Sequence, residues 1–259
     1  MNVLTNGQLI LIGSLASLIA GILTFVGALP VIFVRTISDR LLDSLLGFAA
    51  GIMLAATSFS LIIPSISAAG GGLSGVTICS LGFLLGGLVI LSAEHIIPHR
   101  HFIKGDEGPH SSLRRVWLFV FAITIHNFPE GLAVGVGFGD GHLQAGIKIA
   151  TAIGLQNMPE GLAVAVALLR EKYSLSFTLV IVLLSGLIEP IGGVLGISIV
   201  TFAKVLLPWG LAFAAGAMLW VISHEIIPET HRKGFEKYAT TGVMIGFVVM
   251  MILDNISFV

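Results

Sequence analysis

The sequence predicts an all-α membrane protein with eight transmembrane helices. Of its 259 residues, 56% are hydrophobic and only 10% are charged, whereas a soluble domain has about 25% charged residues. Its mean hydropathy is +1.03. The apolar runs are continuous, which excludes the alternating strands of an outer-membrane β-barrel. The same composition excludes a soluble enzyme, a nucleic-acid binder and a disordered chain.

The N-terminal residues, the single cysteine and the net charge exclude further features of the protein. The first basic residue is Arg35, so we expect no cleaved signal peptide, which would need a positively charged start. The single cysteine, Cys79, excludes an intrachain disulfide and a cysteine-based metal site. The net charge of −1 implies neither an acidic nor a basic macromolecular partner, and the lipid bilayer is the expected surrounding.

Eight apolar runs reach the length of about 20 residues that a bilayer-spanning helix needs. Turn residues and charges separate them, for example SAAGGG at 67 and THRKG at 230. Residues 1–259 are therefore expected to form one transmembrane domain. The expected helices cover about 8–34, 41–64, 73–98, 116–138, 143–169, 174–203, 205–229 and 238–258.

The basic residues predict the orientation. Two of them, Lys148 and Lys204, fall on one side of the membrane, and the other eleven fall in loops on the opposite side. Lys and Arg concentrate in cytoplasmic loops, so the His-bearing loop 99–115 is expected in the cytosol. Both termini are then extracytoplasmic, in a multi-pass protein of the cell (inner) membrane.

Two internal repeats accompany these spans. HNFPEGLAVGV (126–136) and QNMPEGLAVAV (156–166) match at eight of 11 positions, and FAAGIML (48–54) is echoed by FAAGAML (213–219). Each pair lies in spans that run in opposite directions, so the repeats are inverted. Inverted repeats with helices interrupted by Gly or Pro are typical of secondary transporters, which bind substrate near the bilayer midplane.

The first repeat places polar side chains in mid-membrane, where a charged residue costs about 2.5–3.5 kcal/mol and is usually functional. Residues four apart share a helix face, as His126 and Glu130 do. Pro129 and Pro159 also weaken backbone hydrogen bonds and thereby free carbonyl oxygens as further ligands. The two matching sets are His126, Asn127 and Glu130 in the fourth span, and Gln156, Asn157 and Glu160 in the fifth.

Imidazole, carboxylate and amide groups together predict a divalent metal site. Imidazole with carboxylate suits Zn²⁺, Fe²⁺, Co²⁺, Ni²⁺ or Mn²⁺, whereas Ca²⁺ and Mg²⁺ prefer oxygen-only sites. Two carboxylates match the charge of one such ion. Without the ion they repel each other, so protons should compete with the metal. The alternative for any single residue here is a helix kink or hydrogen bonds between helices.

Further candidates lie outside the repeated motif. Glu189, in SGLIEP, could supply a third carboxylate, or it could be an acid at a helix end. The third and seventh spans end in EHIIPHRH and SHEIIPETH. Their polar residues are expected on the cytosolic half, as weaker ligands for a departing metal. These are His95, His99, His224 and Glu225.

Transport is not the only function that this chemistry allows. An intramembrane zinc-dependent hydrolase is the alternative, because a bound metal can activate water. HEIIPETH superficially matches the HExxH pattern of zinc proteases, but the position of the second histidine holds Pro228. A metal-sensing or purely structural membrane protein is a third class. We expect a transporter rather than an enzyme, with no prosthetic group.

HNFPEG (126–131), QNMPEG (156–161), SGLIEP and HEIIPE (224–229) resemble the ZIP (Zrt/Irt-like) family of metal transporters, in particular its bacterial GufA-like branch. The resemblance covers the whole chain. It implies import of divalent metal, chiefly zinc, into the cytosol. It also implies a 3+2+3 helix arrangement, an elevator-type motion and a homodimer.

The resemblance further implies how ligands are shared between two metal positions. His126, Glu130, Gln156 and Glu160 would form one site. Asn127, Asn157 and Glu189 would form a second, with Glu130 and Glu160 bridging. His224 and Glu225 match pathway ligands. Some relatives have Asp at the position of Asn157, so the second site should be weaker here. The sequence does not determine which metal the protein prefers among Zn²⁺, Cd²⁺, Fe²⁺, Mn²⁺, Co²⁺ and Ni²⁺. It also does not determine whether transport is coupled to protons or is facilitated diffusion.

Overall fold

The fold is described from a computed structural model of the chain. The structure describes residues 4–34, 37–96, 99–101, 105–107, 115–139, 141 and 143–256. Within these ranges, only the backbone is described for residues 94–96, 99–101, 105–107, 115 and 118.

Helices dominate the described residues. The α-helices are α1 (Asn6–Ala28), α2 (Asp39–Ala55), α3 (Ile63–Ala68), α4 (Gly72–Ile96), α5 (Arg115–Gly137), α6 (Leu143–Arg170), α7 (Leu175–Gly186), α8 (Glu189–Phe202), α9 (Leu207–Val221), α10 (Ile227–Thr230) and α11 (Glu236–Asn255). Short 3₁₀ segments are η1 (Leu29–Ile32) and η3 (Lys204–Leu206), and π-helical segments are η2 (Ala56–Ile62) and η4 (Ile222–Ile226). A two-stranded hairpin joins β1 (His99–His101) to β2 (Gly105–Glu107).

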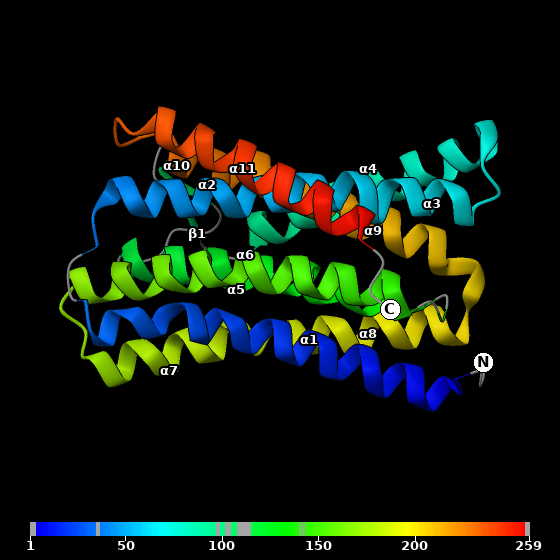
Figure 1. Cartoon of the computed structure of the whole chain (residues 1–259), viewed down its shortest axis with the longest axis horizontal. Coiled ribbons are helices and arrows are strands. Elements are labelled where there is room, and N and C mark those ends of the chain that lie inside the picture. Colours follow the sequence, from blue (N-terminus) through cyan, green and yellow to red (C-terminus); the bar gives the residue numbers. More distant parts are fainter. Residues whose placement is uncertain are drawn as a thin grey trace.

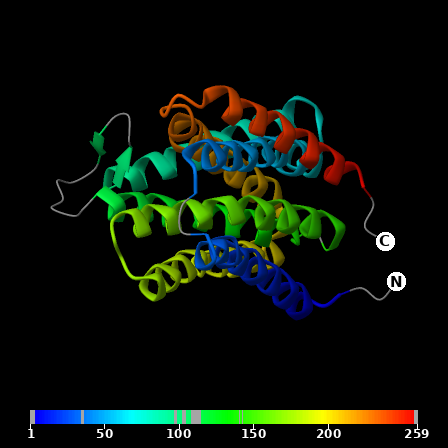
Figure 2. The ribbon, with the colours of Figure 1, turned by 60° about the vertical axis from the view of Figure 1, so that its left-hand side comes forward.

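Eight helical stretches are long and apolar enough to cross a membrane, which confirms the expected all-α membrane fold. The beginning of α1 and the end of α11 lie toward the same end of the bundle (Figure 1), as an even number of spans requires. In Figure 2 the hairpin projects from the side of the bundle, away from both termini. The eight stretches are Asn6–Ile32, Asp39–Ala68, Gly72–Ala93, Phe119–Gly137, Leu143–Arg170, Leu175–Phe202, Lys204–Thr230 and Glu236–Asn255.

Local chemistry sets several helix boundaries. Thr5 and Gln8 form a capping box at the start of α1, and the hydroxyls of Ser38 and Ser174 accept hydrogen bonds from the first turns of α2 and α7. These side chains satisfy amide groups that have no partner inside the helix. Between α3 and α4, residues 70–72 are three glycines with φ of +89°, +70° and +60°, a conformation that glycine adopts without strain.

The helices form two layers, seen edge-on in Figure 1. The lower layer contains α1, α5, α6, α7 and α8, and the upper layer contains α2, α3, α4, α9, α10 and α11. The most extensive packing is within layers, between α1 and α6, α5 and α8, α2 and α11, and α4 and α9. Helices α2 and α6, and α5 and α9, provide the main contacts between layers. The 3+2+3 arrangement implied by the resemblance stays a prediction.

Glycines bring helix backbones into contact inside each layer. A Cβ atom on Gly161 (α6) would lie 1.8 Å from the Thr24 carbonyl oxygen (α1), and one on Gly131 (α5) would lie 1.9 Å from that of Glu189 (α8). In the upper layer, a Cβ on Gly51 would lie 2.0 Å from the carbonyl oxygen of Val243. Every described glycine whose Cβ would come within 3.0 Å of another element's backbone meets a helix of its own layer.

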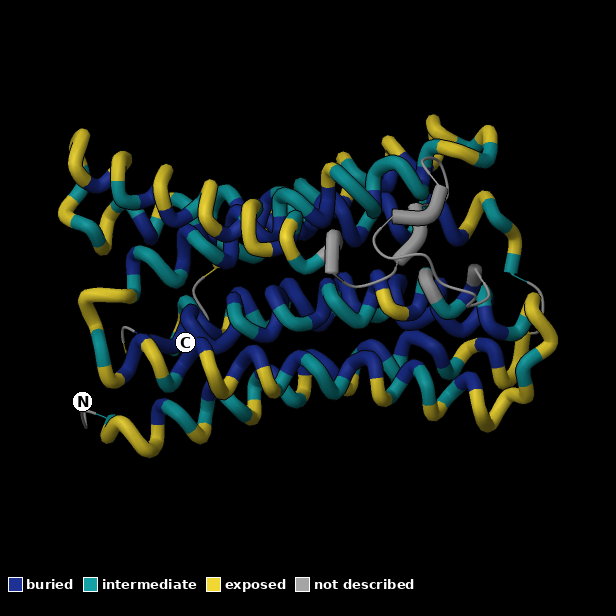
Figure 3. The backbone as a smooth tube through the Cα atoms, turned by 180° about the vertical axis from the view of Figure 1, so that it is seen from behind, coloured by how far each residue is buried: buried dark blue, intermediate teal, exposed yellow. Residues whose placement is uncertain are grey.

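The burial pattern follows the membrane environment. Buried residues line the faces where helices meet, and exposed ones lie on the outside and at the helix ends (Figure 3). The exposed face of α4 is apolar, with Leu84 66% and Leu88 56% exposed. Such a face suits contact with lipid acyl chains, which are as apolar as leucine.

We expect Gly161→Ala to destabilise the protein, because its methyl group would overlap the backbone of α1. Overpacking of this kind costs about 1–3 kcal/mol, a fall of several degrees in Tm, measured by thermal unfolding in detergent. Gly87→Ala is the matched control, because its Cβ would have no neighbour closer than 3.8 Å. An unchanged Tm for Gly161→Ala would contradict the close approach of α1 and α6.

Candidate metal site

The polar residues of the repeated motif lie inside the lower layer. Pro129 and Pro159 are inside α5 and α6 without ending either helix. The seventh candidate, Glu189, is the first residue of α8. Each of the seven side chains is at most 1% exposed: His126, Asn127, Glu130, Gln156, Asn157, Glu160 and Glu189.

One hydrogen bond joins the two copies of the motif. The Gln156 side-chain amide donates to Glu130 Oε1 over 2.6 Å. This bond crosses from α6 to α5 and holds a carboxylate of one repeat against an amide of the other. The remaining oxygens, Glu130 Oε2 and Gln156 Oε1, have no hydrogen-bond partner among the described residues.

Glu189 joins the same polar cluster from a third helix. Glu189 lies near the middle of the apolar stretch Leu175–Phe202, where the helix is interrupted at Leu187–Ile188 and α8 begins with Glu189. A carboxylate at a helix start interacts favourably with the helix dipole. Glu189 Oε1 accepts a hydrogen bond from Asn157 Nδ2 over 2.6 Å, so Glu189 also faces the motif.

The side-chain amides are oriented by their donors. Asn127 Nδ2 donates to the Ser185 carbonyl oxygen over 2.7 Å, and Asn157 Nδ2 donates to the Ala20 carbonyl oxygen over 2.9 Å. Each amide therefore uses its N–H groups to bind the protein. The carbonyl oxygens of both, Asn127 Oδ1 and Asn157 Oδ1, have no partner among the described residues.

Seven buried oxygen acceptors thus lack a donor in the part of the chain that the structure describes. A buried polar group without a hydrogen bond costs about 1–3 kcal/mol, and unpaired buried charge costs more. The described ion pairs include no Lys or Arg for these carboxylates. A bound cation would satisfy the set, which consists of Asn127 Oδ1, Glu130 Oε2, Gln156 Oε1, Asn157 Oδ1, Glu160 Oε1, Glu160 Oε2 and Glu189 Oε2.

The arrangement is not a compact cluster of His and acidic ligands. Among the described residues, no three His, Cys, Asp or Glu side chains form a group able to hold a metal ion. Amide oxygens therefore make up much of the available ligand set. The two-site assignment of the ligands stays a prediction.

His126 is paired with the upper layer. Its Nε2 lies 2.7 Å from Glu225 Oε1, and Glu225 belongs to the π-helical segment η4. Sequence analysis treats Glu225 as a pathway residue separate from the central set, whereas the structure brings the two together across the layer interface. Periodicity could not reveal this contact, because it depends on how the two layers pack.

The other pathway candidates have different surroundings. His224 is partly exposed and stacks on the indole of Trp220, with ring centroids 5.3 Å apart. The side chains of His95 and His99 lie outside the described residues. Their predicted role is therefore neither supported nor contradicted.

The second repeat corresponds to a matching structural irregularity. After FAAGIML, the π-helical segment η2 precedes Pro64, and after FAAGAML, η4 precedes Pro228. π-helical turns inside α-helices are rare and frequently occur at functional sites. The sequence echo indicates that the two spans correspond, but not that each contains a π-helical turn.

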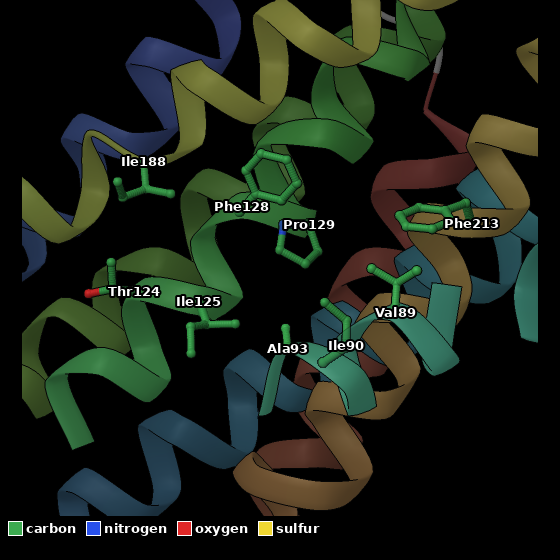
Figure 4. Close-up of a pocket in the computed structure, with 9 residues that line it drawn as sticks. All are labelled: Val89, Ile90, Ala93, Thr124, Ile125, Phe128, Pro129, Ile188 and Phe213. Atoms are coloured by element: carbon green, nitrogen blue, oxygen red, sulfur yellow. The ribbon is translucent and has the colours of Figure 1, made fainter. Parts of the chain in front are cut away.

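A separate apolar cavity of about 360 Å³ lies between the layers beside Pro129 (Figure 4). Thr124 is its only hydroxyl-bearing residue, and that hydroxyl donates to the Val120 carbonyl oxygen over 2.7 Å. The cavity therefore offers no ligands to a metal ion. It is lined by Val89, Ile90, Ala93, Thr124, Ile125, Phe128, Pro129, Ile188 and Phe213.

Comparison with known proteins identifies the family. The family model described as ZIP zinc transporter matches residues 99–254. The chain is 46% identical over 248 residues to zinc transporter GufA of Myxococcus xanthus, covering 93% of this chain and 97% of the relative. It is 43% identical to zinc transporter ZIPB of Bordetella bronchiseptica, covering 90% and 77%, and 33% identical to human zinc transporter ZIP11, covering 90% and 93%. The resemblance seen in the motifs is thereby confirmed, and the chain belongs to the ZIP family of zinc transporters.

Proposed function

We propose that this protein imports divalent transition-metal ions, chiefly zinc, into the cytosol through the buried site between α5, α6 and α8. One observation carries the proposal: seven unpaired acceptor oxygens and an imidazole lie inside a membrane-spanning bundle. This set would match a divalent ion in charge and ligand type. The relatives are named zinc transporters, and zinc is accordingly the first ion to test.

The observations favour transport over the alternative hydrolase. Neither the family description nor the names of the three relatives refers to a hydrolase. The HExxH pattern also fails at Pro228. Water activation would need an ion held with an open position, whereas transport needs only reversible binding.

We propose one strong metal position and a weaker second one. His126, Glu130, Gln156 and Glu160 would hold the first ion. Asn127, Asn157 and Glu189 would complete the second, with Glu130 and Glu160 shared. The uncharged Asn157 amide already donates to Glu189 and Ala20, so only its oxygen is available there.

The orientation and assembly are also proposals. The distribution of Lys and Arg puts both termini outside the cell membrane and loop 99–115 in the cytosol. The family resemblance implies a homodimer. Metal would enter from the side of the termini and leave past Glu225 and His224, whose π-helical segment meets the central site at His126.

We propose that the lower layer moves against the upper layer during transport. The close backbone contacts at glycines are within layers, whereas the contacts between layers are mediated by side chains. Both ends of α6 hold such contacts: Arg170 pairs with Asp39 over 2.8 Å, and Lys148 donates to the Asp254 carbonyl oxygen. Two packed bodies joined by a few exchangeable contacts can slide past each other.

Glu130→Gln and Glu160→Gln should each lower zinc uptake into proteoliposomes by about 10-fold or more, because each removes a charged ligand while preserving side-chain shape. Glu171→Gln, at an exposed turn after α6, is the control and should transport normally. Near-normal uptake by either buried variant, at equal reconstitution, would show that the site is elsewhere.

The orientation can be tested with single cysteines in a Cys79→Ser background. Ser74→Cys, exposed at the start of α4, should react in intact cells with a membrane-impermeant maleimide. Glu171→Cys, equally exposed but at the opposite end, should react only after the cells are opened. The reverse labelling pattern would invert the topology and the direction of transport.

Crosslinking tests the layer motion. In the Cys79→Ser background, Asp39→Cys with Arg170→Cys places thiols on α2 and α6, and a short bifunctional methanethiosulfonate should join them. We expect the crosslink to stop most uptake and a reductant to restore it. Ser60→Cys with Asp254→Cys is the control, because these residues contact each other inside the upper layer over 2.8 Å. Full transport by the crosslinked Asp39–Arg170 pair would contradict the motion.

A further inference from the structure

Helix α1 carries a hydroxyl that the site described so far does not use. Thr24 is 1% exposed, and its Oγ1 has no hydrogen-bond partner among the described residues. Hydroxyls inside helices usually donate to the carbonyl four residues earlier, as Thr124 does to Val120. For Thr24 that carbonyl belongs to Ala20.

Asn157 explains why Thr24 has no such bond. A carbonyl oxygen has two lone pairs. At Ala20, one lone pair serves the α-helical hydrogen bond from the Thr24 amide, and the other accepts Asn157 Nδ2 over 2.9 Å. The Ala20 oxygen is therefore saturated, and the Thr24 hydroxyl is available for another partner.

Thr24 lies on the same side of the site as Asn157 and Glu189. A Cβ on Gly186 would lie 3.1 Å from Thr24 Cβ, and one on Gly161 would lie 3.1 Å from Thr24 Cγ2. The Thr24 hydroxyl lies within interaction range of the Glu189 carboxyl group, although no hydrogen bond of ordinary geometry joins them. Asn157 Nδ2 donates a hydrogen bond to the same carboxyl group over 2.6 Å. Three neighbouring side chains where α1, α6 and α8 converge thus each have an oxygen without a hydrogen bond: Thr24 Oγ1, Asn157 Oδ1 and Glu189 Oε2.

We propose that Thr24 is a further metal ligand, which completes the second ion position from α1. This inference rests on the proposed function. The hydroxyl adds a neutral, hard oxygen, so it increases the number of ligands without replacing the charge that Asn157 lacks. Hard oxygen ligands suit Mn²⁺ better than softer ions. Thr24 therefore favours Mn²⁺ over Cd²⁺ at this position.

The test compares Thr24→Val, which keeps the shape but removes the hydroxyl, with Thr24→Ser, which keeps the hydroxyl. Thr178→Val is the matched control, because Thr178 is also fully buried in the lower layer with an unpaired hydroxyl, but on α7. Binding of Mn²⁺ and Cd²⁺ to the purified full chain is measured by calorimetry, and Tm is measured without metal.

Thr24→Val should weaken Mn²⁺ binding by about 10-fold, with a smaller effect on Cd²⁺, and should lower the number of Mn²⁺ ions bound per chain. Its metal-free Tm should be equal to or above that of the unmodified chain, because removing a buried unpaired hydroxyl relieves a desolvation cost. Thr178→Val should share the Tm effect but leave binding unchanged. Thr24→Ser should bind Mn²⁺ nearly as the unmodified chain does.

Unchanged Mn²⁺ binding by Thr24→Val would overturn the proposal, as would equal losses in the Val and Ser variants, which would indicate packing of the methyl group. Failure of the proposed function gives a different result: the unmodified chain would neither bind nor transport zinc. If the unmodified chain binds metal and Glu130→Gln does not, the central site stands whatever Thr24 does.

Discussion

Three carboxylates buried in a membrane-spanning bundle must be neutralised, and the site is arranged around that requirement. Glu130 and Glu189 each accept one hydrogen bond from a side-chain amide, of Gln156 and Asn157 respectively, and each keeps one oxygen unpaired. Both Glu160 oxygens are unpaired among the described residues. The amides of Gln156 and Asn157 supply oriented dipoles without adding positive charge. Among the described ion pairs, no Lys or Arg side chain neutralises Glu130, Glu160 or Glu189 in place of a bound cation. Buried oxygens without partners are costly, which supports the proposal that these groups bind a divalent ion.

Close backbone packing makes this geometry possible. Glycines at 131 and 161, one residue after each buried glutamate, let α5 reach α8 and α6 reach α1. The motif PEG therefore supplies a helix irregularity, a charge and a point of close approach in three consecutive residues. Since the same motif occurs in two antiparallel spans, it builds both walls of one site.

Contacts between layers have a different character. His126 meets Glu225 across the interface, and α6 is held at each end by one basic side chain. An apolar cavity of about 360 Å³ separates the layers beside Pro129. The pair of Arg170 with Asp39 is exposed, and exposed ion pairs contribute little to stability, so this contact can be exchanged at low cost. Close backbone packing within the lower layer, and an interface without such glycine contacts among the described residues, support the proposed motion of one layer against the other.

The sequence by itself determined the fold class, the number of spans and the two repeated polar motifs, because hydropathy and the spacing of His126 and Glu130 are local properties. It also indicated that Glu189 and Glu225 are candidate functional residues, and that the spans containing FAAGIML and FAAGAML correspond to each other. Only the tertiary structure decided that Glu225 contacts His126, that Asn157 binds Ala20, and that the Thr24 hydroxyl faces Glu189 instead of bonding to Ala20. These facts depend on which helix faces meet and at what height, and periodicity within one span carries no information about its neighbours. The break before Glu189 escaped prediction for a related reason: in an apolar span, proline is compatible with both a kink and a new helix start.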